Sequence, residues 1–309
     1  MSSRKQRARA QVEADLNPTV KVAKKVQAAL SNVDAEQIVF RTGQISLLYA
    51  LILPGSTFGP IANMLSFLGL FIPGLLRQKW FFSVFAGVVF FNFVIGSVWS
   101  ADNHNWLQWY WFVALALVNY ARDSQWALAL SARLLVGGTF TFATAWKILS
   151  HDFPNGSFFE FAGGTENRMA ESLNVLGFKV AEDYNANIDS IKSWVSGFEA
   201  PVGFELLGAD MISGFWPIMA AMTILIEGAI AILYLAPLRK TISWLRDAVM
   251  VSFCFATYLL LPVGGFGMLL VAMGFAASDL EMKRRTWVYG ITMSFIILMV
   301  QRTTLIPRL

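Results

Sequence analysis

The chain has 309 residues, of which 56% are hydrophobic and only 14% are charged, and its mean hydropathy is +0.55. Because soluble domains contain about 25% charged residues, this composition argues against an ordinary water-soluble globular domain. Several apolar runs approach the roughly 20 residues that cross a bilayer, and they predict an all-α, polytopic integral membrane protein. The net charge of +4 collects at the ends of these runs, so we expect contact with membrane lipids and no nucleic-acid partner.

The N-terminal segment is strongly basic. Among the first 30 residues, seven are basic: Arg4, Lys5, Arg7, Arg9, Lys21, Lys24 and Lys25. No apolar stretch of the kind found in a cleavable signal peptide follows them closely. Basic segments before a first span stay on the cytoplasmic side and can contact anionic headgroups. We therefore predict that residues 1–36 form a basic cytoplasmic segment.

About nine membrane spans are expected after this segment. They cover roughly residues 37–54, 58–76, 80–100, 104–120, 125–149, 214–237, 247–262, 264–279 and 286–303. Pro54-Gly55 separates the first two so closely that they form either a tight hairpin or a broken pair. The eighth run is short and Gly-rich, and a re-entrant segment is the alternative there. Spans one to five thus occupy residues 37–149, and spans six to nine lie within residues 214–309.

The charges between the runs predict their orientation. Basic residues mark alternate connections: Arg77 and Lys79, then Arg122, then Arg239, Lys240 and Arg246, then Lys283, Arg284 and Arg285. The positive-inside rule places these connections in the cytoplasm. Residues 150–210 hold ten of the twenty acidic residues and only three basic ones, so they belong outside. The cell inner membrane, with the N-terminus in the cytoplasm, is the expected location.

The external segment, residues 150–213, is too long for a simple loop. Gly163-Gly164 predicts a turn, and Arg168 to Phe178 reads as an amphipathic helix. A second helix is expected on the membrane surface, because apolar residues recur at helical spacing: Ile188, Ile191, Trp194, Val195 and Phe198. This external helical insertion either caps the bundle or forms a lid over an outward-facing pocket.

Lys147, near the outer end of the fifth span, is the most unusual residue. An ammonium group in a bilayer needs a partner, a water-filled cavity or a route to the interface. His151 follows at i+4 and shares its face if the helix continues, while Arg133 lies fourteen positions earlier, near the cytoplasmic end. Snorkelling toward the interface is the plain alternative for Lys147 and for Arg133.

A second charge, Glu227, lies in the middle of the sixth run. A carboxylate at that depth is paired, protonated or functional. The simplest expectation is an ion pair with Arg133 on the fifth span, and a proton relay is the functional alternative.

The fourth span opens with a polar segment, Asp102-Asn103-His104-Asn105-Trp106. Asp102 or Asn103 can cap the helix, and the tryptophan can anchor it at the interface. The functional alternative places His104 at the mouth of the same external pocket as Lys147 and His151.

Other motifs are few. The single cysteine, Cys254, lies inside an apolar run, and no Cys/His spacing predicts a metal site. Gly137-Gly138 and the Gly264-Gly265-Phe266-Gly267 run are expected to allow close helix packing.

Together these motifs resemble the HTTM membrane domain shared by vitamin K-dependent gamma-carboxylase and its bacterial relatives, over nearly the whole chain. The residues that carry the resemblance are Val39-Phe40-Arg41, Asn103-His104-Asn105-Trp106-Leu107, Arg133, Trp146 to Gly156, and Glu227. In the carboxylase, the lysine at that helix end takes a proton from reduced vitamin K, and dioxygen then converts the quinol to an epoxide. The resemblance therefore implies that Lys147 is a catalytic base with His104 as its polar neighbour.

The resemblance also implies an external-side pocket for a lipophilic, quinone-like molecule, with a reduced, vitamin K-like quinone as the cofactor. The residues that would bind the substrate are Asn103, Trp106, Arg133, His151 and Glu227. An amine that apolar walls desolvate can be neutral near neutral pH and then acts as a base.

Three alternatives remain. The fifth and sixth spans also resemble DoxX-type membrane proteins, which are linked to quinone-associated redox or thiol chemistry. A non-catalytic accessory or scaffold subunit would bind a protein partner through residues 150–210. A transporter would use Arg133 and Glu227 as a coupling pair.

Overall fold

The computed structural model describes residues 18–52, 59–95, 103–178, 181–196, 207, 214–239 and 241–305. Within these residues, the only regular secondary structure is helical, which confirms the all-α prediction. The basic residues before residue 18, the Pro54-Gly55 connection and most of residues 197–213 lie outside the described residues.

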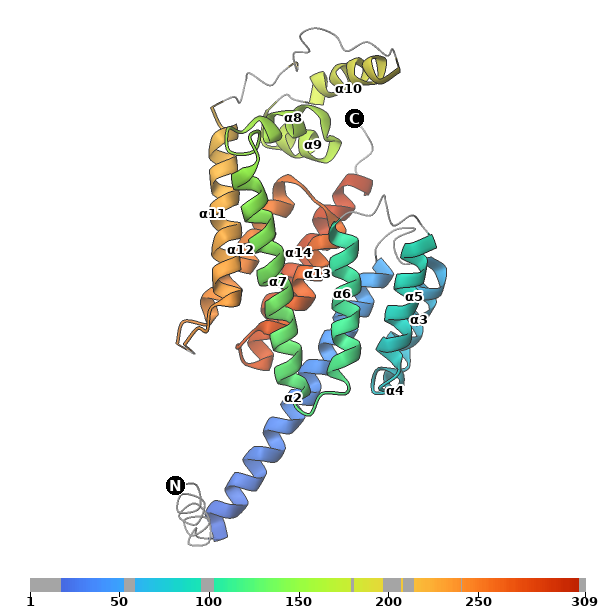
Figure 1. Cartoon of the computed structure of the whole chain (residues 1–309), viewed down its shortest axis with the longest axis vertical. Helices are drawn as coiled ribbons and strands as arrows, with labels where there is room; N and C mark the ends of the chain where they lie inside the picture. The colour runs from blue at the N-terminus through green and yellow to red at the C-terminus, as the bar shows by residue number, and fades with distance from the viewer. Residues whose placement is uncertain are drawn as a thin grey trace.

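The helices occur in three groups along the chain (Figure 1). The first group comprises α2 (Pro18–Ile52), α3 (Gly59–Phe71), α4 (Pro73–Leu76), α5 (Phe81–Ile95), α6 (Asn103–Val118) and α7 (Ser124–Leu149). The second comprises α8 (Ser157–Thr165), α9 (Asn167–Val175) and α10 (Ala181–Ser196). The third comprises α11 (Trp216–Leu235), α12 (Trp244–Leu260), α13 (Gly264–Ala277) and α14 (Met282–Leu305). Each of the nine apolar runs overlaps one of the longer helices, and α2 begins at Pro18 and passes through residue 36 without a break.

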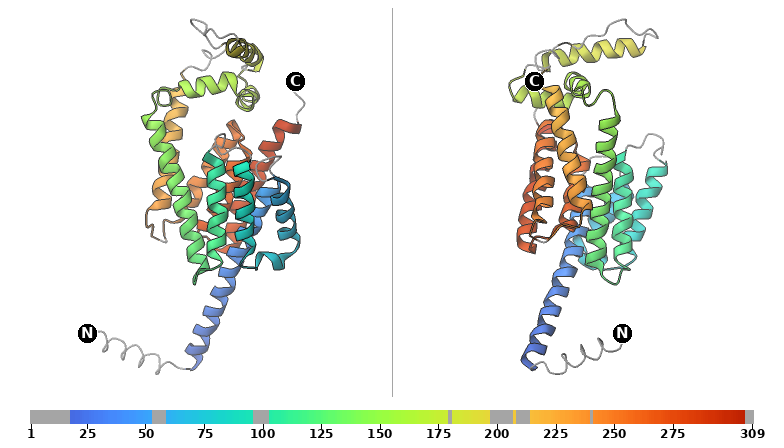
Figure 2. Two further views of the ribbon diagram at one scale, coloured as in Figure 1. Left: turned by 45° about the vertical axis from the view of Figure 1, so that its right-hand side comes forward. Right: turned by 60° about the vertical axis from the view of Figure 1, so that its left-hand side comes forward.

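The first and third groups form one bundle with two distinct ends. At one end lie α4 and the connections from α6 to α7, from α11 to α12 and from α13 to α14; α2 enters from this side. We call this the basic end, because Arg77, Arg122, Arg239 and Lys283 lie in or next to these connections. Helices α8, α9 and α10 lie across the opposite end, which we call the insertion end (Figure 2).

Two helices of the described chain, α7 and α11, are long and apolar enough to cross a membrane by length and composition. Helices α3, α5 and α13 are apolar but shorter. Helices α7 and α11 lie side by side and antiparallel. A Cβ atom added to Gly137 of α7 would lie 2.6 Å from the Leu235 side chain of α11, so any larger residue there would force that side chain to move.

Helix α13 lies at the centre of the bundle, with every residue from Met268 to Ala277 buried. It packs against α2, α7, α12 and α14. It is continuous from the insertion end to the basic end rather than turning back as a re-entrant segment would. Its 14 residues span only about 21 Å at 1.5 Å per residue. Because protein surrounds it, α13 does not have to match the thickness of a bilayer by itself.

The C-terminal end of α13 is held by three guanidinium groups, those of Arg133 on α7, Arg246 on α12 and Arg285 on α14. Arg246 donates to the carbonyl of Ala277 at 3.1 Å and to the Asp279 carboxylate at 3.3 Å. Arg133 donates to the other Asp279 oxygen at 3.0 Å, and Arg285 donates to the carbonyl of Ser278. The last carbonyls of a helix lack partners within the helix, so these cations satisfy them and oppose its dipole.

Two of these arginines differ from the sequence-based interpretation, in which Arg246 and Arg285 only marked cytoplasmic connections. Both are buried, and Asp247, next to Arg246, accepts a hydrogen bond from the Tyr289 hydroxyl at 2.6 Å. Charge counting along the chain assigns a side to a connection, but it does not show that a side chain points back into the bundle.

The described residues of the insertion form three helices, where two were predicted. Gly163-Gly164 was predicted as a turn, which is wrong: both glycines lie in the last turn of α8. A Cβ atom on Gly163 would lie 2.8 Å from the indole of Trp216, so close packing rather than a turn requires glycine there. Helix α9 matches the amphipathic helix expected near Arg168, and α10 matches the second one; the side chains of Trp194, Val195 and Phe198 lie outside the described residues.

Packing fixes the insertion to the bundle. Met169 and Leu173 on the buried face of α9 cluster with Trp216 and Met219 at the start of α11. Gly156, just before α8, has φ +90°, and a Cβ atom there would lie 2.6 Å from the backbone nitrogen of Pro217. The chain therefore enters α8 against the N-terminus of α11, which holds the insertion over that end of the bundle.

Candidate functional site

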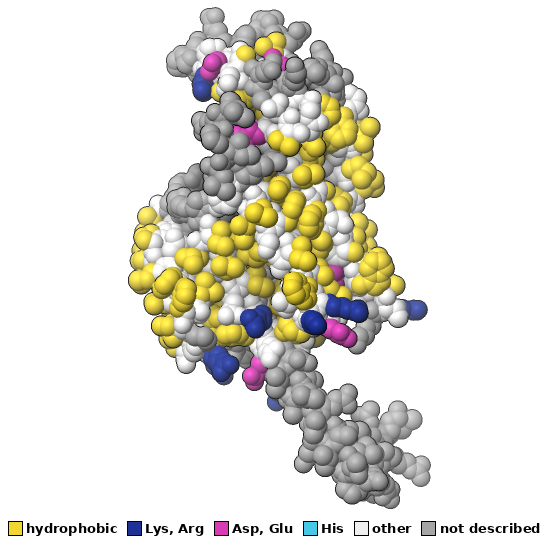
Figure 3. Space-filling model, turned by 180° about the vertical axis from the view of Figure 1, so that it is seen from behind, with side chains coloured by type: hydrophobic (Ala, Val, Ile, Leu, Met, Phe, Trp, Pro, Cys, Tyr) yellow, Lys and Arg dark blue, Asp and Glu magenta, His cyan; other side chains and the backbone are white. Residues whose placement is uncertain are grey.

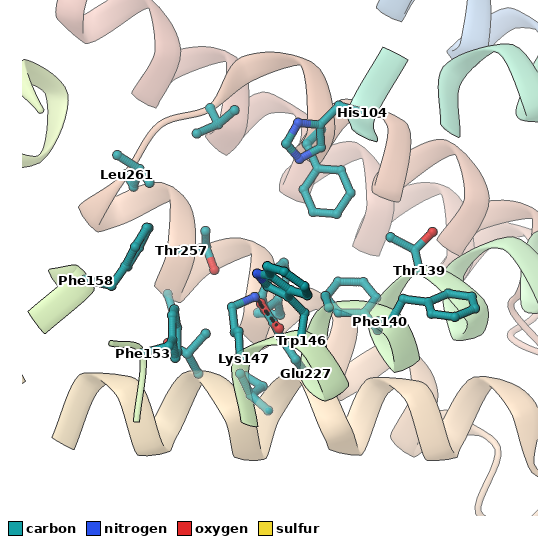
Figure 4. A pocket seen from close by; sticks show the side chains of 18 of the residues that line it. His104, Thr139, Phe140, Trp146, Lys147, Phe153, Phe158, Glu227, Thr257 and Leu261 are labelled. Carbon is teal, nitrogen blue, oxygen red and sulfur yellow. Dashed lines mark hydrogen bonds and ion pairs between the residues drawn. The ribbon is translucent and has the colours of Figure 1, made fainter. Parts of the chain in front are cut away.

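A pocket of about 1360 Å³ lies beneath the insertion. Its walls come from α6, α7, α11, α12 and the beginning of α13, and α8 and α9 cover its end. Most lining side chains are apolar, and many are aromatic (Figure 4). Binding pockets for small molecules usually measure about 300–1,000 Å³ and combine apolar walls with a few polar groups. This pocket has the volume and the composition for a sizeable lipophilic molecule.

The polar groups of the pocket include an ion pair between Lys147 and Glu227. The Nζ atom of Lys147 lies 2.8 Å from Oε1 and 2.6 Å from Oε2 of Glu227, and both side chains are largely buried. The antiparallel register of α7 and α11 produces this pair. Gly137 lies opposite Leu235, and Thr144 lies opposite Gly228, so Lys147 reaches the level of Glu227.

The predicted pair between Arg133 and Glu227 is therefore wrong. Arg133 is about 21 Å from Lys147 along α7, at 1.5 Å per residue, and it binds Asp279 at the basic end instead. In the same register, Arg133 lies beyond the level of Leu235, which is the last residue of α11. The sequence showed the helices as neighbours, but it did not show their register.

The Lys147 ammonium also contacts an aromatic ring from the insertion. Its Nζ atom lies 5.3 Å from the centroid of the buried Phe153 ring. Phe153 packs against Phe158 and Phe159, each at 5.3 Å between ring centroids. A cation within about 6 Å of a ring face is attracted to it. The ammonium is thus held inside the bundle, so the snorkelling alternative does not describe Lys147 in this structure.

His104 lies on the opposite wall of the pocket from Lys147, as Figure 4 shows. It is in the first turn of α6, and its ring centroid lies 4.6 Å from that of Phe266 at the start of α13. Trp106 also lines the pocket and packs edge-on against Phe93 at 4.6 Å.

His151 lies outside the pocket, contrary to the prediction that it shares the face of Lys147. Helix α7 ends at Leu149, and Ser150 is extended with ψ 135°, so the i,i+4 relationship is lost. The side chain of His151 is 93% exposed and lies 3.4 Å from the Asp152 carboxylate. Asn103 begins α6, but its side chain lies outside the described residues.

The structure thus brings four of the predicted site residues together at one pocket: Lys147, His104, Trp106 and Glu227. Arg133 and His151 do not line it. Arg133 lies at the basic end, where it binds Asp279, and His151 lies past the end of α7. The chemical roles of the four pocket residues remain predictions.

Several lining residues were not singled out from the sequence. Phe153 and Phe158 of the insertion and Thr257 of α12 face the pocket (Figure 4). Gly138 lines it as well, whereas Gly137 packs against α11. Two adjacent glycines on a helix face different directions by about 100°, since the helix has 3.6 residues per turn, so they need not share a role. This angular difference is the only indication in the sequence that Gly137 and Gly138 have different roles.

The charges of the site are one ammonium, that of Lys147, and two carboxylates, those of the largely buried Glu227 and of Asp152, whose side chain is 79% exposed. Lys147 and Glu227 cancel each other, and the two hydrogen bonds to Glu227 leave the ammonium one further N–H to donate. The pair therefore offers a donor to a carbonyl or hydroxyl oxygen without adding net charge to the apolar pocket. Among the described residues, no group of three or more His, Cys, Asp or Glu lies where it could hold a metal ion.

Comparison of the chain with protein-family models, with curated proteins and with solved structures gives no match.

Proposed function

We propose that this protein is a polytopic integral membrane protein, of the cell inner membrane, whose pocket at the insertion end binds a lipophilic, quinone-like molecule. In this proposal the nine longer helices cross the membrane, the basic end and the N-terminus lie in the cytoplasm, and the insertion lies outside. The HTTM-like motifs on α6, α7 and α11 belong to the same proposal.

Support for the membrane orientation comes from the surface. Apolar side chains cover the middle of the bundle, and lysine and arginine side chains gather at the basic end, beside the point where α2 leaves it (Figure 3). Many exposed residues of α7 and α11 are large and apolar, including Phe142, Trp146 and Leu225. A soluble monomer rarely exposes such a continuous apolar surface. The positive-inside rule then places the basic end in the cytoplasm.

The observation that carries the ligand proposal is the Lys147–Glu227 pair in the wall of a large aromatic pocket. A flat ring with oxygen atoms fits both features, because the rings of the pocket can stack on it and Lys147 can donate to one oxygen. His104 lies across the cavity from the ion pair and is a further polar group that we assign to the ligand.

In the enzymatic form of the proposal, Lys147 takes a proton from a hydroxyl of the reduced ring. An ammonium cannot accept a proton, so Lys147 must first pass one to Glu227, leaving an uncharged amine and an uncharged acid. The distances of 2.6 and 2.8 Å permit this transfer without movement of either side chain. Glu227 is then the group that makes Lys147 available as a base.

A second candidate function is that of an accessory subunit, in which residues 150–210 bind a protein partner. The exposed apolar side chains of Val175 and Leu176 at the end of α9 favour it. The transporter alternative required Arg133 and Glu227 to form a pair, and Arg133 pairs with Asp279 instead.

Titration of the purified protein in detergent with a naphthoquinone, followed by tryptophan fluorescence, tests the proposal. Trp106 and Trp146 line the pocket, so a bound naphthoquinone should quench tryptophan fluorescence saturably. The matched variant is Lys147→Met with Glu227→Leu, which removes both charges together. A hydrogen bond to a charged group contributes about 1.5–3 kcal/mol, so this variant should bind at least about tenfold more weakly. Absence of saturable quenching in the wild-type protein would refute the ligand proposal.

A further inference from the structure

One face of α7 both lines the pocket and lies on the outside of the bundle. The residues Leu134, Gly138, Phe142 and Trp146 are spaced four apart, so they form one row along the helix, and all four line the pocket. Yet Leu134 is 55% exposed, Phe142 79% and Trp146 76%. A side chain that borders a cavity and is also exposed marks an edge where the cavity opens.

The facing edge of this opening belongs to α6. Trp106 and Tyr110, again four residues apart, line the same pocket, and Tyr110 is exposed. Helices α6 and α7 are joined by a short turn at the basic end and stand farther apart toward the insertion end (Figure 1). The pocket therefore opens sideways between α6 and α7, along the apolar flank of the bundle.

Gly138 is the smallest residue of this row. A Cβ atom added there would meet no atom within 4 Å, whereas one added to Gly137 would collide with Leu235. Helix packing thus explains the glycine at position 137 but not the one at 138. Gly87 and Gly290 are also helical glycines with open space around an added Cβ atom, but neither lines the pocket, so Gly138 is distinguished by its place in the pocket wall. The open space beside Gly138 therefore belongs to the pocket.

The row of four residues starts beside Lys147 and leads away from it along α7. Trp146 directly precedes Lys147, and the row runs from there about 18 Å toward the middle of α7, at 1.5 Å per residue. In the proposed membrane orientation, this path leads from the polar pair at the outer side through the hydrocarbon toward the basic end. A ligand with its ring at Lys147 would lay an attached chain along the row.

We propose that the opening between α6 and α7, with Gly138 at its floor, is a subsite for the long apolar chain of a membrane-resident amphiphile, which enters from the bilayer. This inference rests on the proposed ligand-binding function. The chain is an isoprenoid or acyl chain, because the described lining of the opening consists of apolar and aromatic side chains and carries no charge.

Two probes with the same ring test this subsite: methylnaphthoquinone, which has no chain, and the same ring with a long isoprenoid chain. Binding of each is measured by tryptophan quenching in lipid nanodiscs. In the variant Gly138→Leu, the new side chain fills open space, so the fold should be retained. We expect it to weaken binding of the long-chain probe at least tenfold and to change binding of methylnaphthoquinone less than twofold.

The matched control is Gly290→Leu on α14, where an added Cβ also meets no atom within 4 Å and which does not line the pocket. It should bind both probes as the wild type does. Equal weakening of both probes by Gly138→Leu would overturn the chain subsite, because the site would then hold the ring. Unchanged binding of both probes would overturn it as well, while the pocket proposal would stand. Failure of the wild-type protein to bind either probe would overturn both proposals.

Discussion

The Nζ atom of Lys147 lies within 2.8 Å of both carboxylate oxygens of Glu227, a residue 80 positions later in the chain. This pair joins α7 to α11 in the wall of a large apolar pocket. It lets an apolar environment contain two charges, because neither is left without a partner. The arrangement also means that the two side chains must be tested together, since removal of one changes the surroundings of the other.

Removal of Lys147 alone should destabilise the bundle. In Lys147→Met the Glu227 carboxylate loses its partner, and breaking a buried ion pair by removing one member costs about 3–5 kcal/mol. The double variant Lys147→Met with Glu227→Leu should recover most of this loss, because it leaves no unpaired charge. Unfolding in mixed detergent micelles, followed by tryptophan fluorescence, measures both. A double variant as unstable as the single one would show that the pair stabilises the fold by more than mutual neutralisation.

Arg246 and Arg133, which both bind the C-terminal end of α13, should contribute unequally to the stability of the fold. Arg246 is 2% exposed and donates to Leu233, Ala277 and Asp279, so Arg246→Ala should cost about 3–5 kcal/mol. The side chain of Arg133 is 32% exposed, and Arg133→Ala should cost about 1 kcal/mol or less, as partly exposed ion pairs do. The same unfolding measurement compares them. Similar losses for the two variants would contradict the burial-based ranking.

The contact of Gly156 with the start of α11 should be essential for seating the insertion. Alanine at this position must adopt φ +90°, and its Cβ atom would lie within 3 Å of the backbone of Trp216 and Pro217. We expect Gly156→Ala to cost more than the roughly 1–2 kcal/mol of left-handed strain alone and to raise hydrogen exchange in α8 and α9. Gly177→Ala is the control, since Gly177 has φ +94° but open space around it. Equal exchange in both variants would mean that strain, not the contact, matters.

The two ends of the bundle should lie on opposite sides of the membrane. The native Cys254 is buried and should not react, so single cysteines can report the topology. In the proposed orientation, Lys192→Cys on α10 should react with a membrane-impermeant maleimide in cells with a permeabilised outer membrane. Lys283→Cys near the start of α14 should react only after the inner membrane is disrupted. The reverse pattern would invert the orientation, and labelling of both positions in intact spheroplasts would contradict a membrane-spanning bundle.

The helices themselves were largely predictable, because apolar runs and helical periodicity are local properties. Helix α9 and a helix in each of the nine apolar runs formed where the sequence predicted them, but α2 begins at Pro18, well before the predicted start at residue 37. The turn at Gly163-Gly164 was predicted wrongly, because glycines serve turns and close contacts alike, and only the position of Trp216 distinguishes these uses.

For the site, local spacing predicted some neighbours and not others. Lys147 and His104 were assigned to one pocket because each lies near the external end of its predicted span. The structure places both in the walls of one pocket. His151 was assigned by i,i+4 spacing that requires an unbroken helix, and α7 ends two residues before it. The face of a residue is predictable only where the helix continues.

The sequence by itself determined that the chain is helical, that its helices are apolar, and that half of its acidic residues lie in residues 150–210 while basic residues mark alternate connections. These properties depend on composition and on neighbours along the chain. Only the tertiary structure decided that Lys147 pairs with Glu227, that Arg133 pairs with Asp279, and that Gly138 faces open space while Gly137 does not. Each of these depends on the register in which two helices pack, and register is set by side-chain interlocking over the whole interface rather than by any local pattern.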